Sequence, residues 1–170
     1  MTTAGSRSGT APGRVCQAPA VEIREVSLAD DELARALLQV QHAAYAVEAA
    51  LIQDDRIPPL HEDLDDLRQV SLLWLGALVG ATLVGADGWT EEAGEVDIDR
   101  LLVTPTAHRR GVGSALVRAV LQRAGGRRTL VSTGRDNTPA RSLYERLGFA
   151  WARDQEVVPG LWITRYTHSP

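Results

Sequence analysis

The chain has 170 residues, a length typical of one domain with its own hydrophobic core, and 44% of them are hydrophobic. The longest apolar stretch, residues 71–85, is interrupted by two glycines and is too short to cross a bilayer, so we expect no membrane segment. Residues 1–14 lack the apolar core of a secretory signal, and the single cysteine, Cys16, excludes an internal disulfide. These features favour a cytoplasmic protein.

Charge is distributed unevenly along the chain, although the net charge is only −4. Residues 21–99 hold 18 acidic side chains against 4 arginines, whereas residues 100–153 hold 11 arginines against 2 acidic side chains. This division is typical of a protein with two ligands of opposite charge, and a solvated surface is the alternative explanation. The arginines do not alternate with stacking aromatic residues, which disfavours nucleic acid as a partner.

The first half of the chain predicts one strand and two helices. Residues 1–20 are rich in Gly, Ser, Thr, Ala and Pro and predict a disordered leader, with a single domain over residues 21–170. Alternation over residues 21–26 predicts a strand, and Ser27 or Asp30 can cap the helix that follows. Apolar residues three and four apart predict one buried stripe on that helix, made of Leu33, Leu37, Val40, Ala44, Val47 and Leu51. A short acidic helix is expected over residues 61–70.

In the second half of the chain, the pattern of apolar residues predicts mainly strands, with two helices between them. Strands are expected over residues 71–78, 81–86 and 95–103, and a strand over 129–133 lies between two helices. Those helices are expected over 112–124 and 139–147, and a hairpin over 149–157 and 161–166 closes the chain. The order β-α-α-β-β-β-α-β-α-β-β predicts an α/β domain with a mixed sheet.

A glycine-containing loop between a strand and a helix predicts an anion site. The first amides of a helix have no partner within the helix, and Gly111 and Gly113 leave the approach to those amides open. Arg109 and Arg110 add positive charge, so the loop is suited to a diphosphate. Tight packing of the helix against a strand is the alternative explanation of the two glycines.

Two other phosphate motifs do not fit this loop. A P-loop requires a lysine after its glycines, and the chain contains no lysine. A dinucleotide fingerprint requires a third glycine at the position of Leu116. A nucleotide-dependent enzyme of another class is therefore disfavoured.

A second motif follows, because residues 137–149 read N-x-x-A-x-x-L-Y-x-x-x-G-F. Together, the loop and this motif resemble the GNAT superfamily of N-acetyltransferases, and residues 103–113 are similar to its V-x-P-x-x-[QR]-x-x-G-x-G signature. The resemblance covers about residues 21–166. It implies a single-domain GNAT-like fold, with a mixed, mostly antiparallel central sheet flanked by helices, and acetyl-CoA as co-substrate. His108 departs from the signature, since the family usually has Gln or Arg there, but imidazole can still donate a hydrogen bond to phosphate.

The resemblance also implies roles in binding acetyl-CoA. The backbone of Leu101, Leu102 and Val103 would hold the pantetheine arm, and Asn137 would bond a pantetheine amide while also capping its helix. Tyr144 would protonate the leaving thiolate, and a packed aromatic residue of the core is the alternative. The diphosphate would be held by the amides of Arg109, Arg110, Gly111, Val112, Gly113 and Ser114.

The general base and the acceptor pocket are less closely specified. Many family members have a glutamate where this chain has Asp97, and Asp99 follows two residues later; a solvent-facing carboxylate is the alternative for each. Both share the parity of Leu101, but a bulge, which is common at such sites, would turn them to the other face. Tyr45 and Glu48 lie beside the apolar stripe of the first helix and could form a pocket for a cationic amine, with a solvated helix edge as the alternative.

Taken together, the sequence predicts an N-acetyltransferase that moves the acetyl group of acetyl-CoA to a primary amine by direct attack. The acceptor would be a small molecule or a peptide, and the protein a monomer or homodimer. A non-catalytic module of the same fold that binds or senses acyl-CoA is the alternative. No cluster of His, Cys or carboxylate residues has metal-ligand spacing, so no metal is expected.

Overall fold

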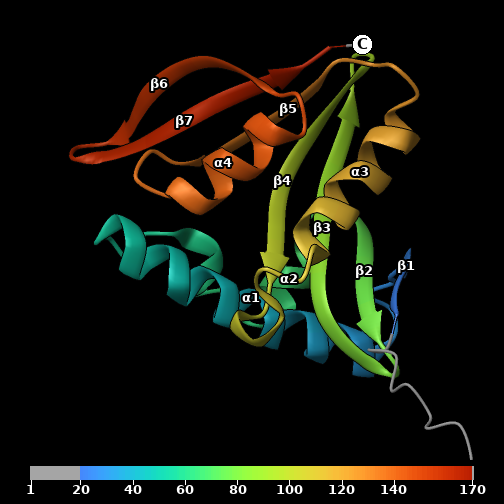
Figure 1. The fold of residues 1–170 in the computed structure, drawn as a ribbon. Coiled ribbons are helices and arrows are strands. Elements are labelled where there is room, and N and C mark those ends of the chain that lie inside the picture. Colours follow the sequence, from blue (N-terminus) through green and yellow to red (C-terminus); the bar gives the residue numbers. More distant parts are fainter. Residues whose placement is uncertain (1–19, 170) are drawn as a thin grey trace, which may run out of the picture.

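The computed structural model describes residues 20–169, which form one seven-stranded sheet with helices on both faces (Figure 1). Single turns of 3₁₀ helix occur at η1 (Pro58–Leu60) and η2 (Pro105–Ala107). The helices are α1 (Asp31–Ile52), α2 (Leu64–Gln69), α3 (Val112–Ala124) and α4 (Thr138–Arg146). The strands are β1 (Val21–Glu25), β2 (Leu73–Val79), β3 (Thr82–Glu92), β4 (Glu95–Val103), β5 (Thr129–Gly134), β6 (Ala150–Val158) and β7 (Leu161–His168).

The order of elements confirms the α/β architecture predicted from the sequence. One strand is longer than expected, because β3 continues to Glu92 instead of ending at Ala86. The predicted leader lies outside the described residues except for Ala20.

The sheet has the order β1-β2-β3-β4-β5-β7-β6 and is antiparallel throughout except where β4 meets β5. These two strands run parallel and pair only between Val96–Ile98 and Thr129–Val131. Beyond those three pairs the strands separate, so the edges of β4 and β5 that face each other have no strand partner. We call this separation the fork.

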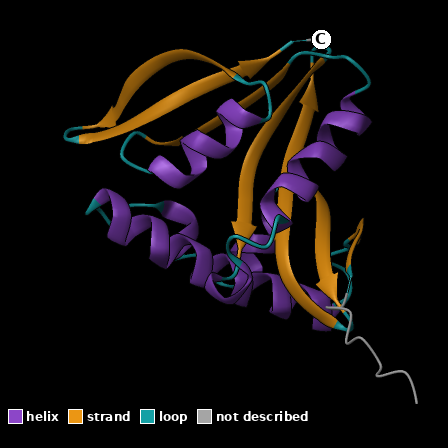
Figure 2. Ribbon diagram, viewed as in Figure 1, coloured by secondary structure: helices purple, strands orange, loops and turns teal. Residues whose placement is uncertain are grey.

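Helices cover the two faces of the sheet in pairs (Figure 2). On one face, α1 and α2 pack over a core that contains Leu37, Leu67 and Leu102. On the other face, α3 and α4 pack over a second core that contains Leu116 and Tyr144. The fork therefore opens between α1 on one side and the N-terminal ends of α3 and α4 on the other.

Helix α1 begins at the cap Asp30, whose carboxylate accepts from the amides of Glu32 and Leu33 at 3.0 and 3.1 Å. The apolar stripe holds for the first half of the helix, where Leu37 is fully buried. At the other end Leu51 is 43% exposed, so the prediction of one continuous buried stripe was wrong there. The reason is that the second half of α1 borders the fork instead of the sheet.

A bulge in β4 changes which side chains face the fork. Gly88 of β3 pairs with Arg100, whereas the next residue, Trp89, pairs with Ile98, so Asp99 is the extra residue. Ile98 and Leu101 consequently both contact the core beneath α3 and α4. The simple parity that aligned Asp97 and Asp99 with Leu101 is thereby broken.

Candidate active site

A cleft of about 570 Å³ lies in the fork. Its walls come from the second half of α1, the end of β4, the loop before α3, and the first turns of α3 and α4. The lining residues are Ala44, Tyr45, Val47, Glu48, Leu51, Leu101, Leu102, Val103, Ala107, His108, Arg109, Gly111, Val112, Gly113, Ser114, Asn137, Pro139, Ala140, Leu143 and Arg146. The cleft thus brings together most of the residues predicted to bind a cofactor.

The two glycines at the start of α3 have different functions. Gly111 is the helix N-cap with φ of +79°, no side chain caps the helix, and a Cβ built on it would meet nothing within 4 Å. A Cβ on Gly113 would lie 3.3 Å from Cδ2 of Leu143. Gly111 therefore keeps the helix amides open to an anion, whereas Gly113 allows α3 to pack closely against α4.

Positive charge at the cleft comes from the loop before α3 and from α4. Arg109 lines the cleft from the loop, and Arg146 lines it from the last turn of α4, a residue that sequence reasoning missed. Arg110 is exposed and is not among the lining residues. His108 uses its Nε2–H to donate to the carbonyl oxygen of Val103 at 3.0 Å, so that nitrogen is already paired.

Asn137 combines a structural contact with a place at the cleft. Its Oδ1 accepts from the amide of Ala140 at 3.2 Å, which caps α4, and only 9% of the residue is exposed. Because the cap uses the side-chain oxygen, the side-chain nitrogen is the atom that could donate to a ligand.

Tyr45 and Glu48 of α1 line the cleft, but Glu48 also supports β5. Its Oε1 accepts from the amide of Gly134 at 3.1 Å and from the hydroxyl of Thr133 at 3.2 Å. Burial, followed by the charge of Glu48, raises the pKa of the Tyr45 hydroxyl far above its usual range. One carboxylate oxygen of Glu48 thus replaces part of the pairing that β5 loses at the fork.

Tyr144 lies deeper than the cleft lining. It is 3% exposed, and its ring packs 5.6 Å from that of Phe149 and 6.0 Å from that of Tyr166. Burial, then the charges of Asp87 and Glu48, raise the pKa of its hydroxyl well above the usual range. Tyr144 is therefore close to groups at the inner end of the fork, but it does not line the wider cleft.

The two candidate bases lie where β4 and β5 begin to separate. Asp97 pairs with Leu130 of β5 and is one of the three residues of β4 that pair with that strand. Asp99 lies just beyond them, in the bulge of β4. Burial, followed by the charge of Asp99, raises the pKa of the Asp97 carboxyl. Neither aspartate lines the cleft.

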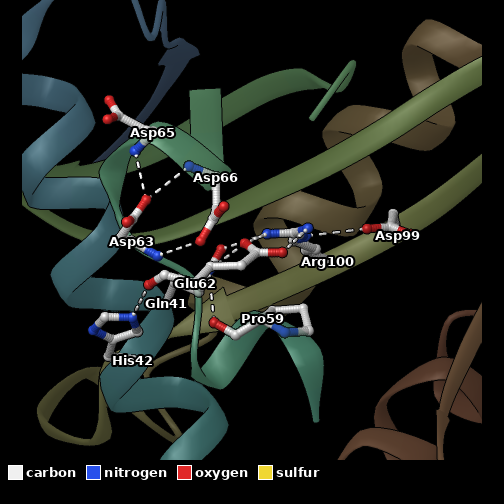
Figure 3. Close-up of polar contacts among 9 residues, drawn as sticks. All are labelled: Gln41, His42, Pro59, Glu62, Asp63, Asp65, Asp66, Asp99 and Arg100. Atoms are coloured by element: carbon white, nitrogen blue, oxygen red, sulfur yellow. Dashed lines mark hydrogen bonds and ion pairs between the residues drawn. The ribbon is translucent and has the colours of Figure 1, made fainter. Parts of the chain in front are cut away.

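A buried arginine connects Asp99 to the helices on its face (Figure 3). Arg100 is 5% exposed and donates to Glu62 at 2.6 and 2.9 Å, to Oε1 of Gln41 at 2.8 Å and to Asp99 at 3.1 Å. Burial acts to raise the pKa of Glu62, but hydrogen bonds from Arg100 and Gln41 outweigh it, and the pKa is lowered. Gln41 also donates to the carbonyl oxygen of Pro59 at 2.8 Å.

This network was not predicted from the sequence. The available signal was a charged or amide residue inside an apolar pattern, as in the strand V-D-I-D-R-L-L-V. Asp87, the lone acidic residue in A-T-L-V-G-A-D-G-W, carries the same signal.

Within residues 20–169, no group of three or more His, Cys, Asp or Glu side chains is placed to hold a metal ion. None of the helices in this range combines the length and the apolar character that a membrane crossing requires.

The sheet of this α/β domain forks beside the start of a helix that no side chain caps, and this arrangement is suited to an anionic ligand. Comparison with known proteins names the class: residues 33–149 match the model of the Acetyltransferase (GNAT) family. The chain belongs to this family, which confirms the resemblance found in its sequence motifs.

Similar proteins extend this finding. The chain is 32% identical over 133 residues to UPF0157 protein YqkA of Bacillus subtilis, covering 78% of this chain and 39% of that protein. It is 36% identical over 110 residues to Mycothiol acetyltransferase of Clavibacter sepedonicus, covering 59% of this chain and 34% of that protein. The chain thus spans well under half the length of both curated relatives.

Among solved structures, the fold is similar to that of PaiA N-acetyltransferase from Thermoplasma acidophilum in complex with coenzyme A. The TM-score is 0.68 at 19% identity, with 89% of this chain and 99% of that chain covered. This likeness confirms the fold predicted from the resemblance.

The ion pair between Arg100 and Glu62 yields a first prediction. Arg100→Met leaves Glu62 and Gln41 without their cation, so the free energy of unfolding should fall by roughly 3–5 kcal/mol. The double variant Arg100→Met/Glu62→Leu removes both charges and should recover most of that loss. Denaturant unfolding measures both values, and equal losses in the single and double variants would contradict the account.

The contact between Glu48 and β5 yields a second prediction. Glu48→Ala removes the acceptor for two donors and should lower the free energy of unfolding by about 1–3 kcal/mol. Glu48→Gln keeps an oxygen at the same place and should cost much less. Thermal unfolding of the two variants side by side provides the measurement; a matching loss in both would show that the charge, and not the acceptor oxygen, holds β5.

Proposed function

We propose that this chain transfers the acetyl group of acetyl-CoA to a primary amine. The observation that carries the proposal is the cleft in the fork, which has an uncapped helix start at one end and two strand edges without partners along its length. These features suit a long, thin ligand with a diphosphate at one end. Membership of the GNAT family supports the same reaction.

The cleft has groups suited to each part of acetyl-CoA. The open amides from Gly111 to Ser114 would hold the diphosphate, with Arg109 and Arg146 compensating its charge. The backbone of Leu101 to Val103 and the side-chain nitrogen of Asn137 would bind the pantetheine arm. Since His108 already donates to the Val103 carbonyl, the pantetheine would form its hydrogen bonds with the other backbone groups at the end of β4.

The chemistry would take place at the inner end of the fork. Bound acetyl-CoA supplies an acetyl group activated as a thioester. Asp97 would be the base that takes the proton from the amine, because burial and the charge of Asp99 raise its pKa. Asp99, which accepts a hydrogen bond from Arg100, would help to position the amine. Tyr144 would donate its proton to the departing thiolate.

The acceptor would enter on the face of α1 and α2, where Tyr45 and Glu48 border the cleft. A small molecule or a peptide with a primary amine fits the acidic character of this half of the chain. We also propose a cytoplasmic location, on the basis of the cysteine content, and a monomer or homodimer as the working state.

A second function is favoured by one observation. Tyr144, Asp97 and Asp99 are absent from the cleft lining, which is the arrangement expected of a module that binds acyl-CoA without turning it over. Free-thiol detection with acetyl-CoA and a panel of amines separates the two functions. Release of CoA that depends on an amine supports the transferase, whereas binding without release supports the module.

Gly111 allows a direct test of the diphosphate site. Gly111→Val should weaken CoA binding strongly, because the side chain would fill the space beside the helix amides. Gly125→Val is the matched control, since Gly125 has a similar positive φ at the other end of α3, outside the cleft. Calorimetry should show weaker binding only for Gly111→Val; a similar loss in both variants would reduce the effect to backbone strain.

Tyr144 allows a test of the chemical step. Tyr144→Phe keeps the ring packing and should lower turnover by ~10²–10⁴-fold with little change in acetyl-CoA affinity. Tyr166→Phe is the control from the same aromatic cluster, because its hydroxyl is bonded to Glu145 at 2.9 Å and lies outside the cleft. Steady-state kinetics with an accepted amine gives both values, and normal turnover in Tyr144→Phe would remove Tyr144 from the mechanism.

A further inference from the structure

Beyond the fork, the sheet continues as an arm of three strands, β5, β7 and β6 (Figure 1). One face of the arm packs on α4, where Val131 and Tyr166 belong to the core beneath α3 and α4. The core beneath α1 and α2 takes its sheet residues from β2, β3 and β4, and within the described residues it contains none from the arm. We call the face of the arm on the side of α1 and α2 the open face.

Arg165 of β7 points to the open face. Side chains alternate between the two faces of a strand, and the next residue, Tyr166, is buried in the core beneath α3 and α4. Arg165 pairs with Ser132 of β5, which follows Val131 of the same core and therefore shares the open face. Arg165 is half-buried in this position.

The candidate base Asp97 points to the same side of the sheet. The residues before and after it in β4 both contact the core beneath α3 and α4, so its own side chain points the other way. Asp97 pairs with Leu130 of β5, and Leu130 pairs with Thr167 of β7, two residues from Arg165. Burial and the charge of Asp99 raise the pKa of Asp97, and the charge of Arg165 acts against them.

Two arginines lie directly opposite each other on the open face. Arg153 of β6 pairs with Arg165, and like charges at opposite positions destabilise a sheet. Within residues 20–169, neither arginine forms an ion pair. The carboxylates of β6 are engaged elsewhere, since Asp154 and Glu156 accept hydrogen bonds at 2.8 and 2.7 Å from a hydroxyl of β7 and an amide of the turn. An anion between the arginines would relieve their repulsion.

Two buried polar atoms on this face also have no hydrogen-bond partner among the described residues. They are Nε of Arg165 and Oε1 of Gln155. Gln155 of β6 pairs with Ile163, two residues before Arg165, so its side chain shares the open face. Buried polar groups are almost always paired, which makes these two atoms the expected contacts of a ligand. Rotation of the Gln155 amide would present its nitrogen to the same anion as Arg165.

We propose that the acceptor of acetyl transfer is a small zwitterion, with its primary amine at Asp97 and a carboxylate or phosphate held by Arg165. This rests on the proposed function. The guanidinium suits either anion, because its N–H groups bind two oxygens at once. Arg153 adds positive charge from the edge strand, and Gln155 adds a hydrogen bond. The open face thereby selects amines that carry an anionic group.

The first measurement concerns binding and does not require turnover. The probes are ω-amino carboxylates from glycine to 6-aminohexanoate, 2-aminoethyl phosphate, and n-alkylamines and diamines of matching length. In protein saturated with CoA, an anionic probe should raise the Tm more than the alkylamine and the diamine of its length. The larger shift, from carboxylate or phosphate, identifies the anion. Equal shifts from anionic and non-anionic probes would overturn the proposal.

The second measurement concerns selectivity. Arg165→Met should lower kcat/KM for the preferred anionic amine by roughly 10–100-fold and leave kcat/KM for the matching alkylamine unchanged. Arg165→Lys keeps the charge without the paired N–H groups and should retain part of the preference. Arg165→Glu should reverse it in favour of the diamine. Arg118→Met is the control, because Arg118 is exposed on α3 on the other side of the sheet, and its selectivity should match the wild type.

The pattern across substrates separates recognition from a structural role. Equal losses for the anionic amine and the alkylamine in Arg165→Met would overturn the proposal, as would an unchanged preference in Arg165→Glu. Failure of the proposed function would be visible in the wild type itself, as absence of acetyl-CoA binding by calorimetry or of CoA release with every amine.

Discussion

The parallel strands β4 and β5 share only three residue pairs, and the cleft of this molecule depends on that short pairing. A sheet that separates in its middle leaves backbone groups without partners on two facing edges, and such groups are costly unless something else satisfies them. The chain meets part of this requirement itself, with Glu48 bonded to β5 and His108 bonded to the end of β4. The edge that remains defines a narrow space in which an extended ligand can take the place of a strand.

Both faces of the sheet contribute polar groups to the surroundings of the fork. Above one face, the start of α3 supplies open amides, and α4 supplies Asn137 and Arg146. Below the other face, Arg100 joins the bulge of β4 to α1 and to the segment before α2. Two arginines of the later half, Arg109 and Arg146, thereby lie at the cleft, whereas the Arg100–Glu62 pair lies on the other side of the sheet.

Local periodicity was sufficient to predict the order of the elements, the start of α3 and the cap at Asn137, because each depends on residues a few positions apart. It was insufficient for the end of β3, where Asp87 and Gly88 interrupt the apolar pattern that identifies a strand. It also could not predict the Arg100–Glu62 pair, whose members are 38 residues apart and meet only through tertiary packing. The burial of Tyr144 also depends on tertiary packing. The motif therefore identifies this residue but does not predict how deeply its ring is buried.

The pair between Arg100 and Glu62 also restrains how the face of the sheet covered by α1 and α2 can move. The segment that carries Glu62 connects η1 to α2, and displacing it would uncover a guanidinium that is 5% exposed while stripping Gln41 of its partners. Such a displacement is costly, so this wall of the molecule is held in a single arrangement before any ligand arrives. An acceptor that bound on this side would therefore meet a preformed surface, with little loss of conformational entropy in the protein.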